Sequence, residues 1–286
     1  MARSAAWVTL LSRGETFPAI ARRERQSRPV PDLLSDPSFY AVALPAVILV
    51  GLSKGGFGGA VGFVGVPLMA LVISPVQAAA ILLPILVLID IVSLWTWRGV
   101  YDRATLVSML PGALIGIGIG WLTAAVVTPD MVRFIVGAVA LVFVARWVFQ
   151  QIRHGADHIA ERNRPAALFW GIVSGFTSFV AHVGGPVFQV YALPLRLDPT
   201  VLSGTAAIFF AVANAVKLIP YFALGQFDAA NLTASAVLMP VAPLATLAGA
   251  WLVRRMRPDI FYPLTYATVA LIAAKLIYDG ASDFLG

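Results

Sequence analysis

The sequence predicts an all-α polytopic membrane protein with about eight to ten transmembrane segments, arranged in two internal repeats. Three observations support this: composition, a series of long apolar stretches, and landmarks that recur in the second half. Of 286 residues, 59% are hydrophobic and 12% are charged, whereas soluble domains carry about 25% charged residues. Mean hydropathy is +0.86. These values exclude a soluble enzyme with one compact core, and the abundant apolar side chains exclude a disordered chain.

The distribution of charge points to a lipid bilayer and not to nucleic acid. The net charge is +6, and the arginines lie between apolar runs, as the positive-inside rule expects of cytoplasmic loops. The chain has no cysteine and three histidines. His154 and His158 lie in a charged linker, which favours a solvated loop. We therefore expect no metal site and no cofactor.

The uneven spread of charge also predicts the domain organisation. Residues 1–38 form a polar, Arg-rich N-terminal tail, and whether this tail is genuine coding sequence is open. Residues 39–150 form the first transmembrane repeat, 151–167 a cytoplasmic linker, and 168–286 the second repeat. This organisation predicts a multi-pass protein of the cell inner (plasma) membrane.

The long apolar stretches give the individual segments, several of them near the ~20 residues that a spanning helix needs. They are 39–53, 55–73, 76–97, 104–127, 131–150, 168–182, 184–195, 200–223, 231–252 and 260–278. The two pairs 39–53/55–73 and 168–182/184–195 are shorter and interrupted by glycine, which weakens helices. Within a bilayer, such interruptions survive only where they are buried in protein or line a cavity. Each repeat is therefore predicted to open with a broken Gly-rich helix or a helical hairpin.

The landmarks of the second half repeat those of the first in the same order. Gly65-Val66-Pro67 corresponds to Gly184-Gly185-Pro186, and Asp90 corresponds to Asn214. Four further matches involve the loops and the prolines that follow. An ordered series of this kind predicts an internal duplication, which is typical of transporters. The alternative is that both halves share only a Gly/Pro-rich loop composition.

The arginine clusters predict the topology. If 146–164 and 254–257 are both cytoplasmic, the broken region 168–195 must cross the membrane an even number of times. Symmetry then makes 39–73 a hairpin as well, gives each repeat five segments, inverts the two repeats and places the C-terminus outside. The alternative is a single crossing by 39–73, which would put the Arg-rich N-terminus inside.

The first break contains the leading candidates for substrate binding: Lys54, Gly55, Gly56, Gly58 and Gly59. Glycines permit unwinding and close backbone approach, so exposed amides and a lysine can hold an anion. Tight packing through small residues is the alternative for the glycines, but it does not explain the lysine. Three lysines occur in the chain, all within or against apolar segments: Lys54, Lys217 and Lys275. Charge at membrane depth is expensive and commonly functional. Lys217 stays open between a functional and an interfacial role, and Lys275 is expected to reach the interface.

The second break brings hydroxyls, amides and a histidine to the matching place. Its candidate substrate-binding residues are Ser174, Ser178, His182, Gly184 and Gln189, to which Asn214 is added from the next segment.

Proton coupling is predicted at His182 and Asp90. His182 could bind the anion or carry a proton, and a hydrogen-bonded structural histidine is equally compatible with the sequence. Asp90 could pair with a lysine or take up a proton, and a structural salt bridge is the alternative. No set of residues resembles a catalytic motif, so catalytic residues are predicted to be absent.

These residues resemble the sulfite exporter TauE/SafE family of membrane permeases. The likeness spans roughly 40–280 and rests on Gly51–Pro67, on Trp97-Arg98-Gly99 with Asp102, and on Gly175–Pro186. The resemblance implies transport of small sulfur-containing anions such as sulfite, sulfoacetate, thiosulfate or other organosulfonates. Lys54 and His182 depart from the family's commoner pattern.

Three functional hypotheses follow. The leading one is a secondary transporter, with a small anionic substrate, that exports sulfur-containing anions by alternating access. The second is an uptake permease for a carboxylate or an inorganic anion. The third, of another class, is a membrane scaffold or enzyme, which would show no substrate-dependent flux. The sequence leaves open whether the protein forms a homo-oligomer.

Overall fold

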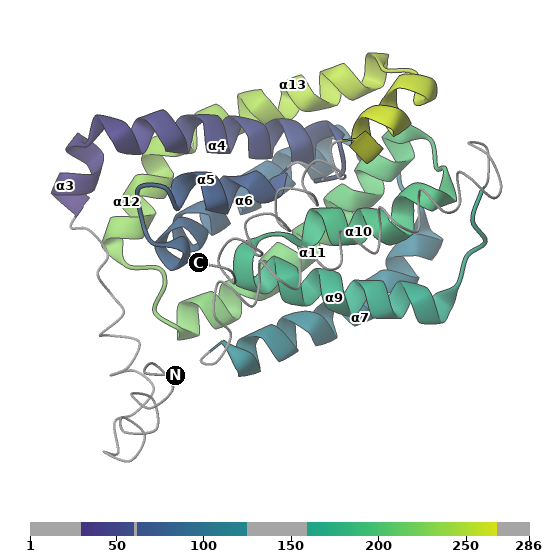
Figure 1. The fold of residues 1–286 in the computed structure, drawn as a ribbon, viewed down its shortest axis with the longest axis horizontal. Coiled ribbons are helices and arrows are strands. Elements are labelled where there is room, and N and C mark those ends of the chain that lie inside the picture. The colour runs from purple at the N-terminus through teal and green to yellow at the C-terminus, as the bar shows by residue number, and fades with distance from the viewer. Residues whose placement is uncertain (1–29, 60–61, 125–158, 268–286) are drawn as a thin grey trace, which may run out of the picture.

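The structure, a computed structural model, describes residues 30–59, 62–124 and 159–267, and every regular element in these ranges is a helix (Figure 1). The predicted all-α membrane class is confirmed. Four described helices are long and apolar enough to cross a membrane, or five if the pair α12–α13, bent by 47°, counts as one span. The elements are α3 (Val30–Ser35), α4 (Pro37–Gly56), η1 (Gly62–Val64), α5 (Gly65–Met69), α6 (Pro75–Thr96), α7 (Arg103–Thr123), α9 (Arg164–Ala181), α10 (Gly184–Ala192), η2 (Leu193–Leu195), α11 (Pro199–Ala223), α12 (Ala229–Leu238) and α13 (Val241–Arg255).

The predicted segment 131–150 lies outside the described residues, as do most of the N-terminal tail, most of the linker and the C-terminal end. In Figure 1, α4 and α13 lie side by side along the top of the molecule and α7 and α9 along the bottom, with α6, α10 and α11 between them. The two predicted breaks therefore lie in the interior, between the upper and lower pairs of helices.

Helix α4 starts at a cap and ends later than the sequence predicted. Asp36 accepts a hydrogen bond from the Ser38 amide, and Pro37 occupies the first turn, where a proline costs nothing. The helix continues through Gly55, so Lys54 lies in its last turn, whereas the first apolar segment was predicted to end at residue 53. The reason is packing: a Cβ at Gly55 would lie 2.0 Å from the Thr246 carbonyl oxygen of α13. The chain turns only at Gly58 and Gly59, whose φ angles are 57° and 78°.

After this turn the chain runs back, so that α4 and α6 are parallel. Met69 and Ile73 share a buried cluster with Leu33 of α3, which directly precedes the beginning of α4. At the other end, the Trp97 Nε1 donates to the Gly55 carbonyl over 2.7 Å. Residues 37–73 therefore have the geometry of a hairpin in which a long helix is followed by a short returning one.

The second broken region has the same form. Helix α9 ends at His182, which adopts a left-handed conformation with φ of 56°. Helix α10 then returns, and the Ala160 amide donates to the Pro194 carbonyl over 2.9 Å at the side where α9 began. The Tyr221 hydroxyl donates to the Phe179 carbonyl over 2.9 Å, so the ends of α11 and α9 lie together. Helices α9 and α11 are thus parallel.

The two hairpins point in opposite directions. The Ser203 hydroxyl, near the beginning of α11, donates to the Gly56 carbonyl at the end of α4. Gly204 lies against the Val100 carbonyl just after the end of α6, and a Cβ there would approach it to 1.7 Å. Helices α6 and α11 are therefore antiparallel, which is the arrangement that an inverted duplication produces.

Small residues let α7 and α9 approach closely. Gly112 and Gly116 on α7 face Gly171 and Gly175 on α9, and a Cβ at any of the four would lie 2.0–2.3 Å from a carbonyl oxygen of the facing helix. Each pair is spaced as Gly-x-x-x-Gly, the pattern that lets membrane helices pack backbone to backbone. This contact fixes the second hairpin against the first half of the chain.

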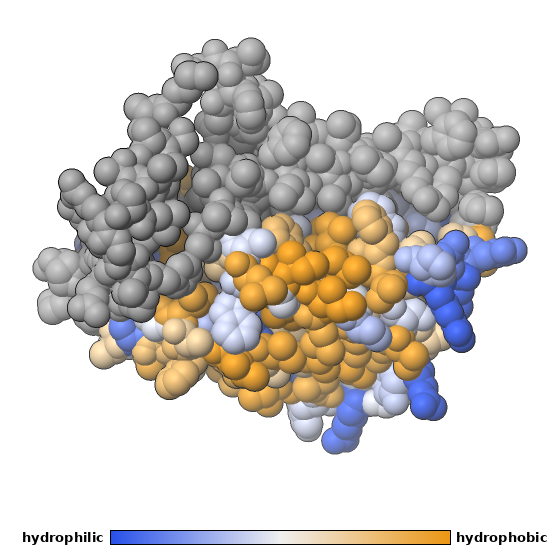
Figure 2. Space-filling model, turned by 90° about the horizontal axis from the view of Figure 1, so that it is seen from below, coloured by the Kyte–Doolittle hydropathy of each residue, from blue (hydrophilic) through white to orange (hydrophobic). Residues whose placement is uncertain are grey.

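Every arginine that the structure describes lies at one end of the bundle, where α6 ends and α7, α9 and α11 begin. These residues are Arg98, Arg103, Arg162, Arg164, Arg196, Arg254, Arg255 and Arg257. The opposite end of the described residues carries Asp36 and Asp228 and no arginine or lysine. Figure 2 shows a broad apolar surface with hydrophilic side chains gathered toward one end. The positive-inside rule predicts that the arginine end is cytoplasmic.

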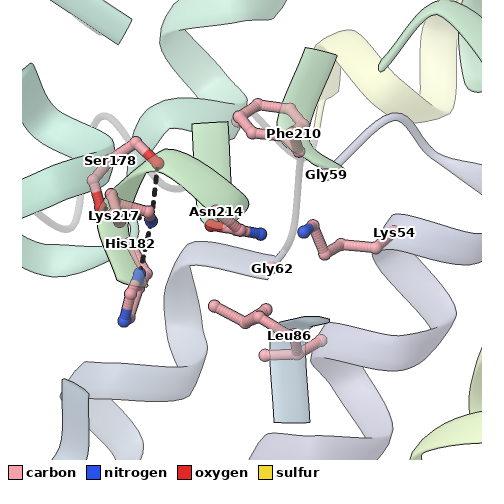
Figure 3. A pocket seen from close by; sticks show the side chains of 11 residues that line it. Lys54, Gly59, Gly62, Leu86, Ser178, His182, Phe210, Asn214 and Lys217 are labelled. Carbon is pink, nitrogen blue, oxygen red and sulfur yellow. Dashed lines mark hydrogen bonds between the residues drawn. The ribbon is translucent and has the colours of Figure 1, made fainter. Parts of the chain in front are cut away.

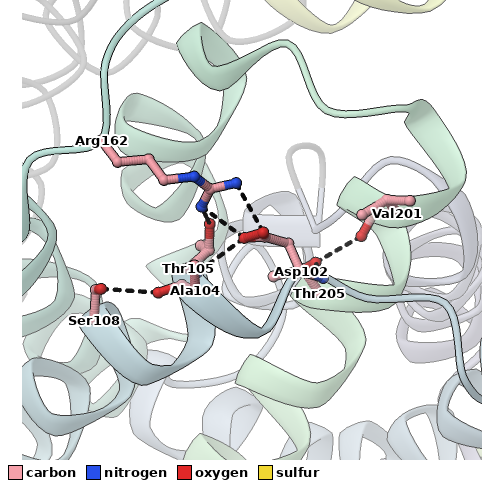
Figure 4. A network of polar contacts seen from close by, with 7 residues as sticks. All are labelled: Asp102, Ala104, Thr105, Ser108, Arg162, Val201 and Thr205. Carbon is pink, nitrogen blue, oxygen red and sulfur yellow. Dashed lines mark hydrogen bonds and ion pairs between the residues drawn. The ribbon is translucent and has the colours of Figure 1, made fainter.

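Arg162, in the last part of the predicted linker 151–167, fixes the chain to this end. Its guanidinium donates to both carboxylate oxygens of Asp102, over 2.7 and 2.8 Å (Figure 4). Asp102 also caps α7 by accepting from the Thr105 amide over 3.0 Å. Burial by itself raises the pKa of Asp102, but the hydrogen bonds from Arg162 and Thr105 outweigh burial and hold this pKa below its ordinary value.

Single-cysteine labelling tests this orientation cleanly, because the chain has no cysteine of its own. Glu161→Cys, at the arginine end, is expected to react with a membrane-impermeant maleimide only after the cells are broken. Ala229→Cys, at the opposite end, is expected to react in intact cells. Labelling of Glu161→Cys in intact cells would reverse the orientation, and equal labelling of both variants would contradict the placement of their segments at opposite faces.

Candidate functional site

The two breaks touch in the interior of the bundle. A Cβ at Gly185, in the first turn of α10, would lie 2.0 Å from the Gly59 carbonyl oxygen of the first break. The Gln189 side chain bridges the same junction, where its Nε2 donates to the Phe57 carbonyl over 3.2 Å and to the Gly58 carbonyl over 3.1 Å. The backbone of one break is thus held directly against the backbone of the other.

A cavity of about 20 Å³ lies beside this junction (Figure 3). This volume holds about one or two water molecules and is smaller than a sulfonate group. The residues that line the cavity come from both hairpins: Val50, Lys54, Gly59, Gly62, Leu86, Ser178, His182, Gly185, Phe210, Asn214 and Lys217. In Figure 3, Lys54 lies on one side and Lys217 with His182 on the other, and Asn214 lies between them.

Lys54 forms a buried ion pair with Asp90. Its Nζ lies 2.5 Å from Asp90 Oδ1, and the Asn214 Nδ2 donates to Asp90 Oδ2 over 2.5 Å. Both carboxylate oxygens therefore accept hydrogen bonds, which is the pattern of an ionised carboxylate. The Lys54 ammonium also lies 5.3 Å from the centre of the Phe210 ring, within cation–π range. A charge buried in this way is stable only because it is paired and hydrogen-bonded.

Lys217 is fully buried and has no carboxylate partner among the described residues. Its Nζ donates to the Ser178 carbonyl over 2.9 Å, to the Ser178 hydroxyl over 3.1 Å, and to His182 Nδ1 over 2.9 Å. Three acceptors match the three N–H donors of an ammonium group. As an ammonium group, Lys217 is therefore solvated by neutral groups only, and none of these contacts supplies a counter-ion.

The contacts of His182 define its tautomer. The Nε2 lies 3.0 Å from the Ala79 carbonyl, which can only accept, so the Nε2 carries the proton. The Nδ1 is then free to accept from Lys217. His182 is neutral in this arrangement, because a proton on both nitrogens would place two donors against each other.

The described ionisable groups at the cavity thus sum to one positive charge. This sum counts Lys54 and Lys217 as ammonium groups, Asp90 as a carboxylate and His182 as neutral. The backbone of α10 adds to this, since its N-cap Val183 supplies no side-chain hydrogen bond and Gly185 of its first turn lines the cavity. Helix N-termini favour anions. The groups that face the cavity are therefore of the kind that bind small anions: ammonium groups, a hydroxyl and backbone amides.

Most of the predicted site residues lie at or beside this cavity. Lys54, Gly59, Ser178, His182 and Asn214 line it.

Most of the remaining predicted residues contact the residues that line the cavity and support its walls. Asp90 contacts two of the lining residues, and Gly58 is held by Gln189. The Ser174 hydroxyl donates to the Gly184 carbonyl over 2.9 Å, which braces the second break.

Gly55 and Gly56 lie elsewhere. They face α13, where a Cβ would approach the carbonyl oxygens of Thr246 to 2.0 Å and of Gly249 to 2.3 Å, and neither lines the cavity. For these two glycines, helix packing is the role that the geometry supports.

Six of the lining residues were absent from the predicted set, and two of them, Lys217 and Phe210, bring a charged group and an aromatic ring to the site. The sequence left the role of Lys217 open because a proline follows at position 220. A usable signal was its spacing from Asn214, since residues three apart share one face of a helix. Phe210 gave no signal, because one aromatic residue in an apolar helix is ordinary.

An all-helical bundle with spanning helices, and with a charged cavity between two broken helices, defines a polytopic membrane protein of the transporter class. The chain belongs to the sulfite exporter TauE/SafE family, whose profile matches residues 43–276. It is also similar to the "Probable sulfite/organosulfonate exporter TauE" of Cupriavidus necator, with 29% identity over 193 residues, 66% of this chain and 68% of that protein. No solved structure matches the chain.

Family membership confirms the resemblance that the sequence motifs indicated. The chain is therefore a membrane transporter and not an enzyme, and the scaffold-or-enzyme hypothesis is wrong.

Proposed function

We propose that the protein is a secondary transporter that exports small sulfur-containing anions, such as sulfite, sulfoacetate or other organosulfonates, across the plasma (inner) membrane. The observation that carries this proposal is the cavity where the two breaks meet, which two lysines line and beside which one carboxylate lies. The similarity to the exporter of Cupriavidus necator supports the class of substrate.

The energetics of Lys217 favour an anionic ligand. A charge buried without a counter-ion costs several kcal/mol, so its retention in a bilayer points to a function. A sulfonate has three acceptor oxygens and one delocalised charge. Lys217, the Ser178 hydroxyl and the first turn of α10 supply donors on one side of the cavity, and Lys54 supplies charge on the other.

The placement of the site between two oppositely directed hairpins supports transport by alternating access. The cavity is too small for the anion as it stands, so substrate entry requires the first break to move relative to the second. Such a movement separates Gly59 from Gly185 and breaks the hydrogen bonds of Gln189 to the Phe57 and Gly58 carbonyls. The inverted repeats that the sequence predicts over 39–150 and 168–286 would give this movement a counterpart on each side of the membrane.

The experiment is substrate-dependent flux in proteoliposomes. Labelled sulfite or sulfoacetate is expected to enter faster when the vesicles are preloaded with the unlabelled anion, since exchange of this kind requires a carrier that alternates. Thermal shifts across sulfite, sulfoacetate, methanesulfonate and acetate test the substrate class. A larger shift with acetate than with any sulfur oxyanion would favour the carboxylate permease. Absence of counterflow with every anion would contradict transport by alternating access.

A further inference from the structure

We propose that Asp90 sets the charge of the transported anion: with Asp90 ionised the cavity accepts a monoanion, and a dianion enters only together with a proton on Asp90. This inference rests on the proposed function and adds to it a charge selectivity and a stoichiometry. It assigns Asp90 a role that does not require contact with the substrate.

The position of Asp90 makes it a charge regulator and not a ligand. Lys54 and Asn214 occupy its two oxygens at 2.5 Å each, and they separate the carboxylate from the cavity, which both of them line. The Asp90 side chain is nearly completely buried. Its charge therefore acts across the cavity with less screening than at the surface, because the carboxylate is buried away from bulk water.

The balance of charge depends on this one carboxylate. The titratable groups that face Asp90 and the cavity from the surrounding described helices are Lys54 on α4, His182 at the end of α9, and Lys217 on α11. His182 is neutral by its contacts, so the lysines contribute two positive charges and Asp90 removes one. A monoanion then brings the site to neutrality, whereas a dianion leaves one buried negative charge in excess.

Protonation of Asp90 changes this balance by one unit. The Lys54 ammonium then loses its counter-ion, and the site carries two positive charges. A dianion restores neutrality in that state. Binding of a dianion and uptake of one proton are therefore linked, while binding of a monoanion leaves Asp90 unchanged.

Methanesulfonate and sulfate are suitable probes, because both are small tetrahedral sulfur oxyanions and they differ by one charge at neutral pH. The wild-type protein is expected to bind methanesulfonate more tightly and to take up about one proton per sulfate bound. Calorimetry in buffers of different ionisation enthalpy measures this uptake. Asp90→Asn is expected to shift the affinity ratio toward sulfate by at least ten-fold and to remove the proton uptake.

The chain offers a matched control in the exchange Asp90→Asn with Asn214→Asp. This double variant moves the carboxylate across the same 2.5 Å contact, from α6 to α11, and keeps the net charge of the site. It is expected to restore the preference for methanesulfonate. If Asp90 served folding alone, the double variant would have normal stability, but the sulfate-to-methanesulfonate affinity ratio would not follow the net charge of the site.

Two results would overturn the inference. One is an unchanged sulfate-to-methanesulfonate ratio in an Asp90→Asn protein that still binds methanesulfonate. The other, which does not depend on the variant folding, is sulfate binding to the wild-type protein without proton uptake. If the wild-type protein binds neither probe nor sulfite, the proposed function fails instead, so the two failures are distinguishable.

Discussion

Lys217→Met is expected to abolish most anion binding while leaving the protein folded. Loss of one charged hydrogen bond to the anion costs about 1.5–3 kcal/mol, or roughly ten- to hundred-fold in affinity. The cavity also loses its net positive charge, because Lys54 and Asp90 then balance each other. We expect sulfite or methanesulfonate to give no thermal shift and counterflow to fall to the background of empty vesicles.

This variant is a sharper test than removal of Lys54. Lys54→Ala would leave Asp90 buried without its cation, which destabilises proteins by about 3–5 kcal/mol. Lys217 has only neutral partners, and methionine matches its length, so the variant loses hydrogen bonds but creates no unpaired charge. Lys275→Met, at the remaining lysine of the chain, is the control and is expected to bind normally. Unchanged affinity in folded Lys217→Met protein would assign this lysine to packing.

Gly116→Ala is expected to lower stability strongly, whereas Gly118→Ala on the same helix is expected to be neutral or stabilising. A Cβ at Gly116 would lie 2.0 Å from the Ile172 carbonyl oxygen, so α7 and α9 would have to separate. Backbone atoms cannot move aside as a flexible side chain can. At Gly118 nothing lies within 4 Å of the added carbon. There alanine gains up to about 1 kcal/mol of helix propensity.

The measurement is the melting temperature of each purified variant in the same detergent, with the yield of monodisperse protein as a second readout. Both substitutions add one methyl group to one helix, so helix propensity and detergent effects are matched. Equal melting temperatures would show that α7 and α9 do not depend on close backbone contact. A loss at Gly118 alone would place the contact on the opposite face of α7.

The glycines of the first hairpin show where sequence reasoning reaches its limit. Gly55 and Gly59 lie within one Gly-rich stretch, and both fit a broken helix. In the structure Gly55 is helical and faces α13, whereas Gly59 adopts a positive φ and forms the turn. Glycine is selected for a missing side chain as well as for backbone freedom, and composition does not separate the two. Only the position of α13 distinguishes them.

The sequence by itself determined the class of the protein and the form of its two hairpins. Scarce charge and long apolar stretches require a bilayer, because so little polar surface cannot cover a soluble protein. The Gly-rich interruptions imply an interior site, since lipid does not satisfy an open backbone. Lys54 and Asp90 were identifiable because charge at membrane depth is expensive enough to need a reason.

Only the tertiary structure decided how those charges are shared. Lys54 was predicted to face an anion, yet it pairs with Asp90, and Lys217 on another helix is left with neutral partners. Ion pairing depends on distances of a few ångströms between side chains more than thirty residues apart, and spacing along the chain does not report these distances. The net charge of the cavity is thus a property of four helices brought together, which no single segment of the sequence encodes.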